Sequence, residues 1–420
     1  MKKLVVIGQG YVGLPMALRA AEKGFVVVGL DTNERIVREL GVGRSHIDDV
    51  SNEELAEGLA AGYTASSDPT CIADADVVVV CVPTPLSVDG GPDLRPVESA
   101  ARTIGQHIRH GALVVLESTT YPGTTEEAFA PLVSGDLEIG RDIHVAFSPE
   151  RIDPGNATFG VQNTPKVVGG LTPACTRAAK DFYSVFVDVV VEAKGAKEAE
   201  MAKLIENTFR HVNIALVNEM VRFSHELDID LWDAIDCAAT KPFGFMAFRP
   251  GPGVGGHCIP VDPSYLSHRV KAQLGYAFRM VELAEEINAA APLYVADRLW
   301  QALNDNRKSV NGSKVLLLGV TYKPDISDCR ESPAVPLAQR LASWGAEISY
   351  HDPFVPQWSP RAGAASLSSV EDPYRAACEA DAAILLQAHR HYDLERLAAE
   401  GSLLLDTRAA LPWGGGVNRL

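Results

Sequence analysis

The stretch Leu4-Val5-Val6-Ile7-Gly8-Gln9-Gly10-Tyr11-Val12-Gly13 decides the fold of the first part of the chain. Its four consecutive apolar residues are typical of a parallel strand that is buried on both faces. The glycines that follow have the spacing G-x-G-x-x-G, and a helical pattern continues from 14 to 23. A second apolar run, 26–30, ends at Asp31. This order of strand, glycine turn, helix, strand and acid predicts a dinucleotide-binding Rossmann unit.

The same residues indicate which dinucleotide would bind. Glycines allow the pyrophosphate to approach the N-terminus of the helix, where backbone N–H groups favour anions. Asp31 would accept hydrogen bonds from the adenosine ribose, and its charge would repel a 2′-phosphate. We therefore expect NAD rather than NADP as the cofactor. The predicted cofactor-binding residues in this stretch are Gly8, Gly10, Tyr11, Val12, Gly13 and Asp31.

The alternation of strands and helices continues, and polar residues follow several predicted strands. The apolar runs 76–82, 113–116 and 144–147 lead into Thr84, Thr119 and Glu150. Ligands of open α/β sheets lie outside the carboxyl ends of the strands, so these three residues are site candidates. Either threonine could instead cap a helix or hold a turn, and Glu150 could belong to a solvated turn.

Two long helical patterns occupy the middle of the chain. The first covers 196–227 and places Lys203 and Asn207 four residues apart, on one helical face. The second covers 276–303. An ordinary amphipathic helix with a solvated lysine would explain the first pattern equally well. We interpret 200–302 as a central helical segment that links two α/β parts and builds dimer contacts.

Between these helices lies the stretch Gly251-Pro252-Gly253-Val254-Gly255-Gly256-His257-Cys258-Ile259-Pro260-Val261-Asp262. Its glycines and prolines exclude an ordinary helix or strand, and glycines let a ligand approach the backbone closely. A cysteine on such a loop, followed by Asp262, suggests a positioned nucleophile. A tight turn with a structural thiol remains an alternative on this stretch alone.

A second α/β pattern begins at 314–319 and continues through a helix near 335–344 and strands near 347–350, 382–386 and 403–406. It predicts a smaller nucleotide-binding-type domain without the full glycine fingerprint. Lys323 and Arg330 follow its first strand and would suit phosphate oxygens, or could be exposed charges on a surface loop. His107, His110, His389 and His391 have no carboxylate or cysteine partner at ligand spacing, so we interpret them as surface histidines.

The predicted fold class is therefore α/β with three domains, 1–199, 200–302 and 303–420. Composition agrees with a globular enzyme, since 46% of the 420 residues are hydrophobic. The net charge of −16 argues against nucleic acid or an anionic membrane as the main partner. Seven scattered cysteines without a C-x-x-C pair indicate neither a disulfide framework nor a metal site. No apolar run reaches the ~18 residues of a membrane span, so we expect a cytoplasmic protein.

Taken together, these motifs resemble the UDP-glucose/GDP-mannose dehydrogenase family. The matching pieces occur in family order and span almost the whole chain: Gly8 to Gly13, Val82-Pro83-Thr84-Pro85, Ser118-Thr119, Ser148-Pro149-Glu150, Lys203 with Asn207, Gly251 to Asp262, and Lys323 through Arg330-Glu331-Ser332. The resemblance implies an N-terminal NAD-binding domain, a central dimerisation domain and a C-terminal UDP-binding domain. It also implies a homodimer through the central helices and a UDP-sugar substrate.

The resemblance further implies a chemistry, in which an alcohol at the sugar C6 is oxidised twice with two NAD molecules reduced in turn. Cys258 would attack the aldehyde as a thiolate, because an aldehyde can donate a hydride only after a nucleophile makes it tetrahedral. Lys203 and Asn207 would steady the oxyanion, Asp262 would serve in acid/base work, and Glu150 would activate the hydrolytic water. Thr119 would position the nicotinamide and the water. Thr84 and Arg330 are assigned to the cofactor, and Glu150, Arg151, Lys203, Asn207, Lys241, Gly255 and Lys323 to the substrate.

One departure from the family pattern bears on the substrate. UDP-glucose dehydrogenases carry a second glutamate four residues after the position of Glu150, where this chain has Pro154, with Asp153 beside it. Other segments, including Thr240-Lys241-Pro242-Phe243-Gly244-Phe245, resemble the UDP-N-acetylglucosamine 6-dehydrogenase branch. We therefore expect UDP-N-acetylglucosamine, with UDP-N-acetylmannosamine or UDP-glucose as alternatives. A two-electron 3-hydroxyacid or 6-phosphogluconate-type dehydrogenase and a non-enzymatic NAD-sensing protein are the rival classes.

Overall fold

The computed structural model of the chain describes residues 2–87, 91–152, 156, 158–256, 259–360, 365–414 and 416–420. Two compact units make up the chain, each drawn from two segments. Unit 1 contains residues 1–206 and 264–276, and unit 2 contains residues 207–263 and 277–420. Each unit is described by itself.

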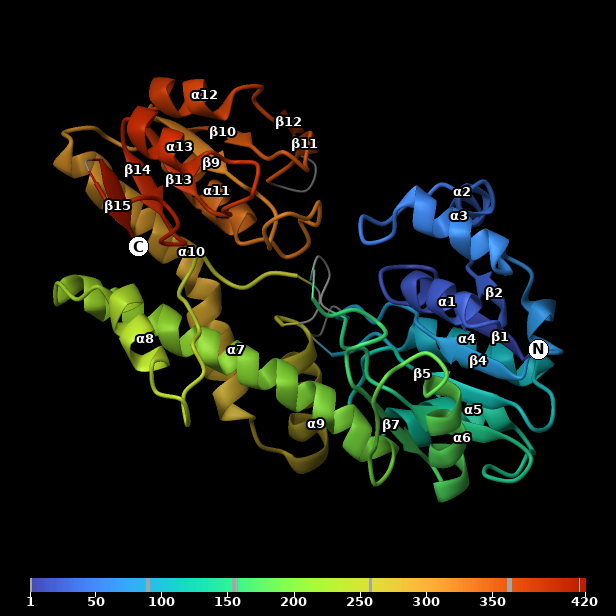
Figure 1. Ribbon diagram of the computed structural model, residues 1–420. Helices are drawn as coiled ribbons and strands as arrows, with labels where there is room; N and C mark the ends of the chain where they lie inside the picture. Colours follow the sequence, from blue (N-terminus) through green and yellow to red (C-terminus); the bar gives the residue numbers. More distant parts are fainter. Residues whose placement is uncertain are drawn as a thin grey trace. The chain divides into compact units, whose positions relative to one another are not determined.

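Within the described residues, unit 1 is built on an eight-stranded sheet with the order β3-β2-β1-β4-β5-β6-β7-β8 (Figure 1). The strands are β1 Lys3–Ile7, β2 Val26–Leu30, β3 Tyr63–Ser66, β4 Val77–Val80, β5 Leu113–Leu116, β6 His144–Phe147, β7 Lys166–Gly170 and β8 Val190–Glu192. Neighbouring strands are parallel except β6 and β7, which are antiparallel. The strand order reverses between β1 and β4, and such a switch point is where doubly wound sheets bind ligands.

Helices cover both faces of this sheet because alternate residues of each strand point to opposite sides. In β1, Leu4 and Val6 pack in one core cluster with residues of α1 (Gly13–Glu22) and α6 (Pro173–Tyr183). Val5 and Ile7 pack in a second cluster with residues of α4 (Arg95–His107) and α5 (Ala130–Ser134). Burial on both faces is the physical reason that these strands are continuous apolar runs.

The remaining helical segments of unit 1 are α2 Glu34–Gly41, α3 Asn52–Ala60, the 3-10 turn η1 Pro69–Ile72 and the π-helical turn η2 Thr125–Phe129. Two helices, α7 Ala196–Glu226 and α9 Asp262–Leu274, contain residues of both units. The part of α9 in unit 1 packs on that unit, since the hydroxyl of Tyr265 donates to the carbonyl of Thr84 and Arg269 pairs with Glu127.

Unit 2 contains the rest of α7 together with α8 Leu231–Ala239 and α10 Arg279–Asp305 (Figure 1). Within its described residues a parallel five-stranded sheet has the order β10-β9-β13-β14-β15. These strands are β9 Lys314–Leu318, β10 Glu347–His351, β13 Ala382–Leu385, β14 Leu404–Asp406 and β15 Val417–Arg419, and a short antiparallel pair joins β11 Gln357–Trp358 to β12 Leu367–Ser368. Here too the strand order reverses, between β9 and β13.

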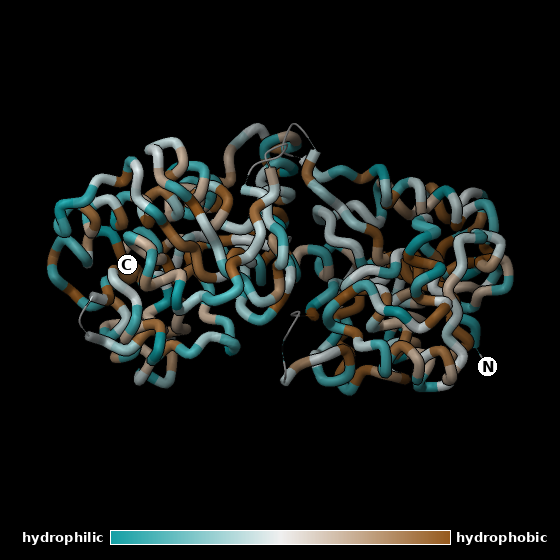
Figure 2. Tube along the Cα trace, turned by 90° about the horizontal axis from the view of Figure 1, so that it is seen from above, coloured by the Kyte–Doolittle hydropathy of each residue, from teal (hydrophilic) through white to brown (hydrophobic). Residues whose placement is uncertain are grey.

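The sheet of unit 2 is also covered on both faces. Val315 and Leu317 of β9 pack in a cluster with α10 and α11 (Ala334–Ser343), whereas Leu316 and Leu318 pack with α12 (Pro373–Glu379) and α13 (Leu394–Glu400). Hydrophobic segments accordingly gather in the interior of each unit, and hydrophilic segments lie on the outside (Figure 2).

The predicted α/β class is confirmed, with a mostly parallel Rossmann-like sheet in unit 1, a parallel one in unit 2, and long helices in the central part of the chain. The strands expected at 4–7, 26–30, 113–116, 144–147 and 314–318 all form, as do both long central helices. The exact division into 1–199, 200–302 and 303–420 stays a prediction. Within the described residues we find no helix with the length and apolar character needed to cross a bilayer.

Candidate active site

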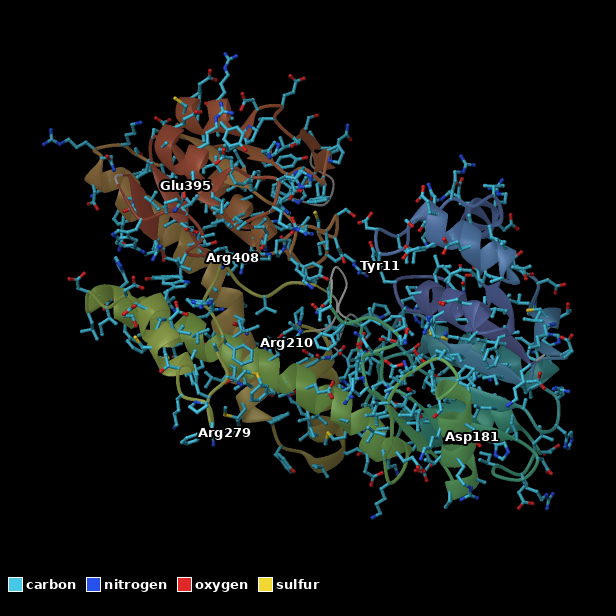
Figure 3. All side chains as sticks on the ribbon, in the orientation of Figure 1. Tyr11, Asp181, Arg210, Arg279, Glu395 and Arg408 are labelled. Carbon is cyan, nitrogen blue, oxygen red and sulfur yellow. The ribbon has the colours of Figure 1, made fainter. Side chains whose placement is uncertain are left out.

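The glycine turn of unit 1 lies at the carboxyl end of β1, next to the switch point of the sheet. Gly8 has φ +91°, and a Cβ there would lie 2.6 Å from the carbonyl oxygen of Cys81. A Cβ at Gly13 would lie 1.9 Å from the carbonyl oxygen of Gly8. These two glycines are thus required by the close packing of β1, β4 and α1, whereas a Cβ at Gly10 would meet no atom within 4 Å. Tyr11 lies on the same loop (Figure 3).

Asp31 is held at the end of β2 by two backbone groups. Its Oδ2 accepts the N–H of Gln9 at 2.9 Å and its Oδ1 accepts the N–H of Asn33 at 2.8 Å. Gln9 is itself fully buried, and its Oε1 accepts the hydroxyl of Tyr63 at 2.8 Å. The position of the carboxylate is therefore fixed by the buried turn that precedes α1.

These residues fit NAD. The open space at Gly10 leaves room for a pyrophosphate beside the backbone. Among the described residues no side chain caps the N-terminus of α1 at Val12, so its first-turn N–H groups can serve an anion. The fixed Asp31 carboxylate has the chemistry that accepts ribose hydroxyls.

A buried ionic cluster lies past the ends of β5 and β6. The ammonium of Lys166, on β7, is 3.0 Å from Glu117 Oε1 and 3.2 Å from Glu150 Oε2. The hydroxyl of Tyr183 donates to the Glu117 carboxylate, and the ammonium of Lys166 also lies 5.2 Å from the centre of the Tyr183 ring. The side chains of Lys166 and Glu150 are each only 9% exposed, and that of Glu117 is fully buried. Two buried carboxylates thus share one buried cation.

The cluster shifts the pKa values of the two carboxylates in opposite directions. Burial alone would raise the pKa of Glu150, but Lys166, the backbone N–H of Ile152 and Lys203 outweigh it and lower that pKa. For Glu117, burial and the charge of Glu150 outweigh Lys166, and its pKa is raised. Glu150 is therefore the carboxylate that stays ionised, as a general base must.

The influence of Lys203 on Glu150 places two predicted catalytic residues near each other, from α7 and from the loop after β6. Arg151 turns elsewhere: its guanidinium pairs with Glu206 and donates to the carbonyl of Pro165 at 3.0 Å. Thr84 and Thr119 do not cap helices, since the next helical segments begin at Arg95 and Thr125. Both lie at the carboxyl end of the sheet, and their roles stay predictions.

In unit 2 the nucleophile loop is described on either side of Cys258, which itself lies outside the described residues, as do Asp153 and Pro154. Asn207 Nδ2 donates to Asp262 Oδ2 at 2.6 Å, so these two predicted catalytic residues meet. A Cβ at Gly255 would lie 2.6 Å from both the carbonyl oxygen of Glu331 and the Cβ of Tyr322. The N–H of Gly256 donates to the carbonyl of Arg330 at 3.0 Å. The glycine loop therefore packs directly on the loop that follows β9.

The switch point of unit 2 repeats the geometry of unit 1. Gly319 has φ +80°, and its N–H donates to the carbonyl of His351 at 2.9 Å, as Gly8 donates to that of Leu30 at 2.8 Å. Asp352 follows β10 and accepts the N–H of Val320 at 2.8 Å, the counterpart of the bond from Gln9 to Asp31.

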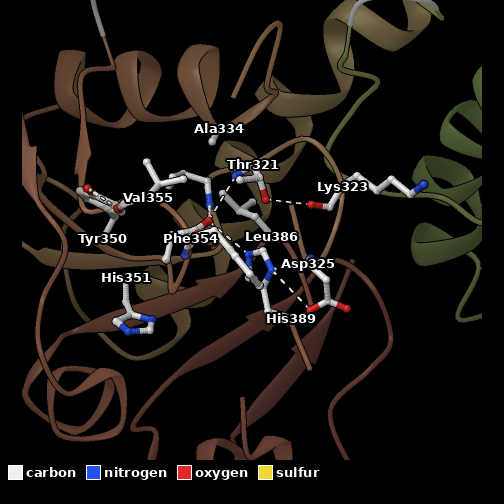
Figure 4. Close-up of polar contacts among 12 residues, drawn as sticks. Thr321, Lys323, Asp325, Ala334, Tyr350, His351, Phe354, Val355, Leu386 and His389 are labelled. Carbon is white, nitrogen blue, oxygen red and sulfur yellow. Dashed lines mark hydrogen bonds and ion pairs between the residues drawn. The ribbon is translucent and has the colours of Figure 1, made fainter. Parts of the chain in front are cut away.

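In unit 2 the Asp352 carboxylate has a histidine, His389, as its partner. Nε2 of His389 lies 3.2 Å from Asp352 Oδ2, and its Nδ1 accepts the N–H of Asp325 at 2.9 Å (Figure 4). The acceptor role of Nδ1 places the proton on Nε2, facing Asp352. The prediction that His389 is a surface histidine is wrong: it is 1% exposed, because its carboxylate partner comes from another strand.

His389 and Asp352 therefore hold the loop that carries Lys323. The hydroxyl of Thr321 donates to the carbonyl of Lys323 at 2.8 Å, while the Lys323 side chain extends away from His389 (Figure 4). Arg330 makes a two-point pair with Asp328, at 3.0 and 2.7 Å. Lys241 is exposed and lies 4.9 Å from the centre of the Phe243 ring.

Sequence reasoning missed Glu117, Lys166, Asp352 and His389 as parts of these sites. Glu117 and Asp352 could have been found by their position directly after a strand, the criterion applied to Glu150. Lys166 stands at the start of a strand that was not predicted, and no local signal marks it.

A glycine turn with its acid at the switch point of one Rossmann-like sheet, and a second Rossmann-like sheet with a matching switch point, are typical of a dinucleotide-binding protein with a second nucleotide-binding-type domain. Residues 2–187 match the NAD binding domain of the UDP-glucose/GDP-mannose dehydrogenase family, 197–290 its central domain and 316–412 its UDP binding domain. The chain belongs to this family, and it is an NAD-dependent UDP-sugar dehydrogenase.

The chain is similar to individual relatives over most of their lengths. The chain is 36% identical over 356 residues to a UDP-N-acetyl-D-glucosamine 6-dehydrogenase of Pseudomonas aeruginosa, covering 84% of this chain and 83% of that protein. It is 34% identical over 424 residues to a UDP-N-acetyl-D-mannosamine dehydrogenase of Methanocaldococcus jannaschii, covering 98% and 93%. A solved UDP-D-ManNAc dehydrogenase from Pyrococcus horikoshii superposes with a TM-score of 0.88 at 31% identity, covering 99% and 98%.

Proposed function

We propose that the protein oxidises the C6 hydroxyl of a UDP-N-acetylhexosamine to the carboxylate, with UDP-N-acetylglucosamine as its substrate. The observation that carries this proposal is the likeness, over most of the chain, to relatives named for UDP-N-acetyl-D-glucosamine and UDP-N-acetyl-D-mannosamine. UDP-N-acetylmannosamine and UDP-glucose are the alternatives to be compared.

The chemistry divides between the two units. The glycine turn and Asp31 would hold two NAD molecules in turn, and each would supply the hydride acceptor for one of the two oxidations. The first oxidation leaves an aldehyde and releases the hydroxyl proton. The thiolate of Cys258 then adds to the aldehyde carbon, and loss of the second hydride leaves a thioester. Water adds to the thioester carbonyl, Glu150 accepts its proton, and the thiolate leaves.

The surrounding residues support this sequence of steps. Lys203 supplies a positive charge near Glu150, suited to an oxyanion formed at the same carbon. The bond from Asn207 to Asp262 fixes two polar side chains beside the end of the cysteine loop. In unit 2, Lys323 on the loop after β9 offers a cation to the diphosphate of the substrate, whereas Arg330 is assigned to the cofactor.

The test is the number of NADH molecules formed per sugar consumed, with the three UDP-sugars compared side by side. Two NADH per sugar, abolished in Cys258→Ala, is the expected result, and UDP-N-acetylglucosamine should be fastest. Cys378→Ala, an exposed thiol on α12, is the matched control. One NADH per sugar, or a Cys258→Ala variant with normal turnover, would mean that the thioester route is wrong.

We also propose that two copies associate through α7 and α10. Phe209, Leu216 and Phe223 recur every seven residues on α7 and are 46–52% exposed. A seven-residue repeat keeps side chains on one helical face, and an apolar stripe of this kind is typical of an interface. Leu216→Glu should convert a dimer to a monomer in light scattering, whereas Val42→Glu on unit 1 should not. A monomeric parent protein would exclude this proposal.

A further inference from the structure

The buried cluster around Lys166 is larger than the reaction described above requires. That reaction uses Glu150, yet the structure surrounds Glu150 with a lysine, a second glutamate and a tyrosine from three other elements. Burying two carboxylates and one ammonium is costly unless they are paired and hydrogen-bonded. Because burying these charges costs free energy of desolvation and they lie beside a predicted general base, we expect the cluster to serve that base.

We propose that Lys166 is a positioning residue for Glu150, fixing the orientation of its carboxylate and supplying the charge that keeps it ionised. Glu117 and Tyr183 in turn hold Lys166. This inference rests on the proposed role of Glu150 in hydrolysing the thioester.

The contacts assign each atom of Glu150 a distinct environment. Its Oε1 accepts the backbone N–H groups of Arg151 and Ile152, and its Oε2 lies 3.2 Å from the Lys166 ammonium. The carboxylate is therefore gripped at both oxygens, and its rotation is prevented. A general base needs this fixed direction, because proton transfer requires the acceptor oxygen within hydrogen-bond reach of the water.

Lys166 is also fixed in position, by contacts to two carboxylates. Its ammonium meets Glu117 Oε1 at 3.0 Å, and Tyr183 donates to the same carboxylate. The charge of Glu117 and Glu150 overcomes burial and raises the pKa of Lys166, so the cation is permanent at neutral pH. A lysine with one partner could swing away, whereas one with two buried partners stays in place.

Other groups near Glu150 do not replace Lys166. Among the described residues, the charged and titratable groups around it are Lys166 from β7, Lys203 from α7, Glu117 after β5, Cys81 after β4, Tyr183 from α6 and the adjacent Arg151. Arg151 is engaged with Glu206. Lys203 also lowers the pKa of Glu150, and Lys166 contributes more.

The experiment compares Lys166→Met, Lys166→Arg and the control Lys180→Met, which removes an exposed lysine paired with Glu192 at 2.6 Å. Stopped-flow absorbance follows NADH during the first turnover and in the steady state. Lys166→Met should retain the rapid formation of two NADH per site, because both oxidations precede hydrolysis. Its steady-state rate should fall tenfold or more, and intact mass spectrometry should detect the sugar acyl adduct on the protein.

The pH profile separates this role from a structural one. The acidic limb of kcat reports the ionisation of the base in the enzyme–substrate complex. Without Lys166, burial dominates, the pKa of Glu150 rises, and the acidic limb should move upward by about 1–3 pH units. Lys166→Arg keeps the charge and should restore the limb toward the parent position. Lys180→Met should match the parent protein in every measurement.

Removal of Lys166 alone leaves Glu117 buried without its cation. The double variant Lys166→Met/Glu117→Gln removes both charges and keeps an amide that can accept from Tyr183. It should fold, bind NAD as the parent does, and show the same slow hydrolysis and shifted limb. If it hydrolyses normally, Lys166 is structural and the inference is wrong.

Glu150→Gln distinguishes this failure from failure of the proposed function. If Glu150→Gln forms two NADH and then stalls while the Lys166 variants turn over normally, the proposed function stands and the role of Lys166 is refuted. If Glu150→Gln itself hydrolyses at the parent rate, the proposed role of Glu150 is wrong, and the inference falls with it.

Discussion

The glycine turn provides a sharp test of which glycines serve the fold and which serve the cofactor. Gly10→Ala adds a methyl group where the structure has no atom within 4 Å, and Gly10 has no positive φ. Gly13→Ala adds the same methyl group 1.9 Å from the carbonyl oxygen of Gly8 and 3.2 Å from the side chain of Val6. The two variants should therefore fail in different ways.

For Gly13→Ala, α1 must move away from the strand by more than 1 Å to reach an ordinary contact, as judged from the 1.9 Å approach. Overpacking of this kind costs about 1–3 kcal/mol. At about 2–4 °C per kcal/mol for a domain of roughly 200 residues, the Tm should fall by about 2–12 °C. For Gly10→Ala the Tm should be unchanged or slightly higher, since alanine restricts the unfolded chain by about 0.4–1 kcal/mol.

The affinity for NAD should fall for Gly10→Ala, the variant that keeps its stability. The Gly10 methyl group would occupy space that a pyrophosphate needs, and a loss of about 1.4 kcal/mol corresponds to a tenfold higher Kd. We expect an increase of at least about tenfold for Gly10→Ala, measured by calorimetric titration with NAD. Thermal melts with and without NAD give an independent reading, because saturation at about 100 times Kd stabilises by about 2.7 kcal/mol.

Gly41→Ala is the matched control, since a Cβ there also meets nothing within 4 Å and Gly41 is exposed at the end of α2. It should change neither Tm nor Kd. Normal NAD binding by Gly10→Ala would refute the interpretation of this loop as the pyrophosphate site. An unchanged Tm for Gly13→Ala would refute the packing argument.

Three further variants test the rest of the site. Asp31→Ser should raise the Kd for NAD by about 10- to 150-fold, as expected for loss of a charged hydrogen bond worth about 1.5–3 kcal/mol, and raise the Kd for NADP less; equal losses would exclude a ribose contact. His389→Asn should raise the KM for the UDP-sugar with kcat and NAD affinity nearly unchanged, because it loosens the loop held by Asp352; a defect in NAD binding would contradict this. Gly255→Ala should lower activity and Tm together, since its Cβ would lie 2.6 Å from that of Tyr322, and a fully active variant would show that the loop can shift.

Much of the fold follows from local sequence. The runs at 4–7, 77–80 and 314–318 are apolar without interruption because strands of these sheets are buried on both faces. The glycine spacing and Asp31 identify the dinucleotide unit, since a tight turn and a ribose acceptor each require particular residues at particular distances along the chain. Short-range requirements of this kind can be recognised in a single sequence.

The positions of single polar side chains are harder to predict from local sequence. His389 looks like a surface residue in the sequence, yet Asp352, 37 residues away, and the N–H of Asp325 enclose it. The contact of Arg151 with substrate stays a prediction, and the structure pairs its guanidinium with Glu206, 55 residues further along the chain. Burial of a polar group depends on which strands become neighbours, and that is decided by the whole sheet.

The sequence by itself therefore determined the class of fold, the cofactor and the family, because those rest on hydrophobic patterns and on motifs whose residues lie close together in the chain. Only the tertiary structure decided that Lys166 meets Glu117 and Glu150 at once. Glu117 lies 49 residues before Lys166 and Glu150 lies 16 before it, and the three meet because β5, β6 and β7 are adjacent in the sheet. These strands are covered by α6, so the three charged groups are shielded from water. Each of them therefore has to be paired with another group of the protein.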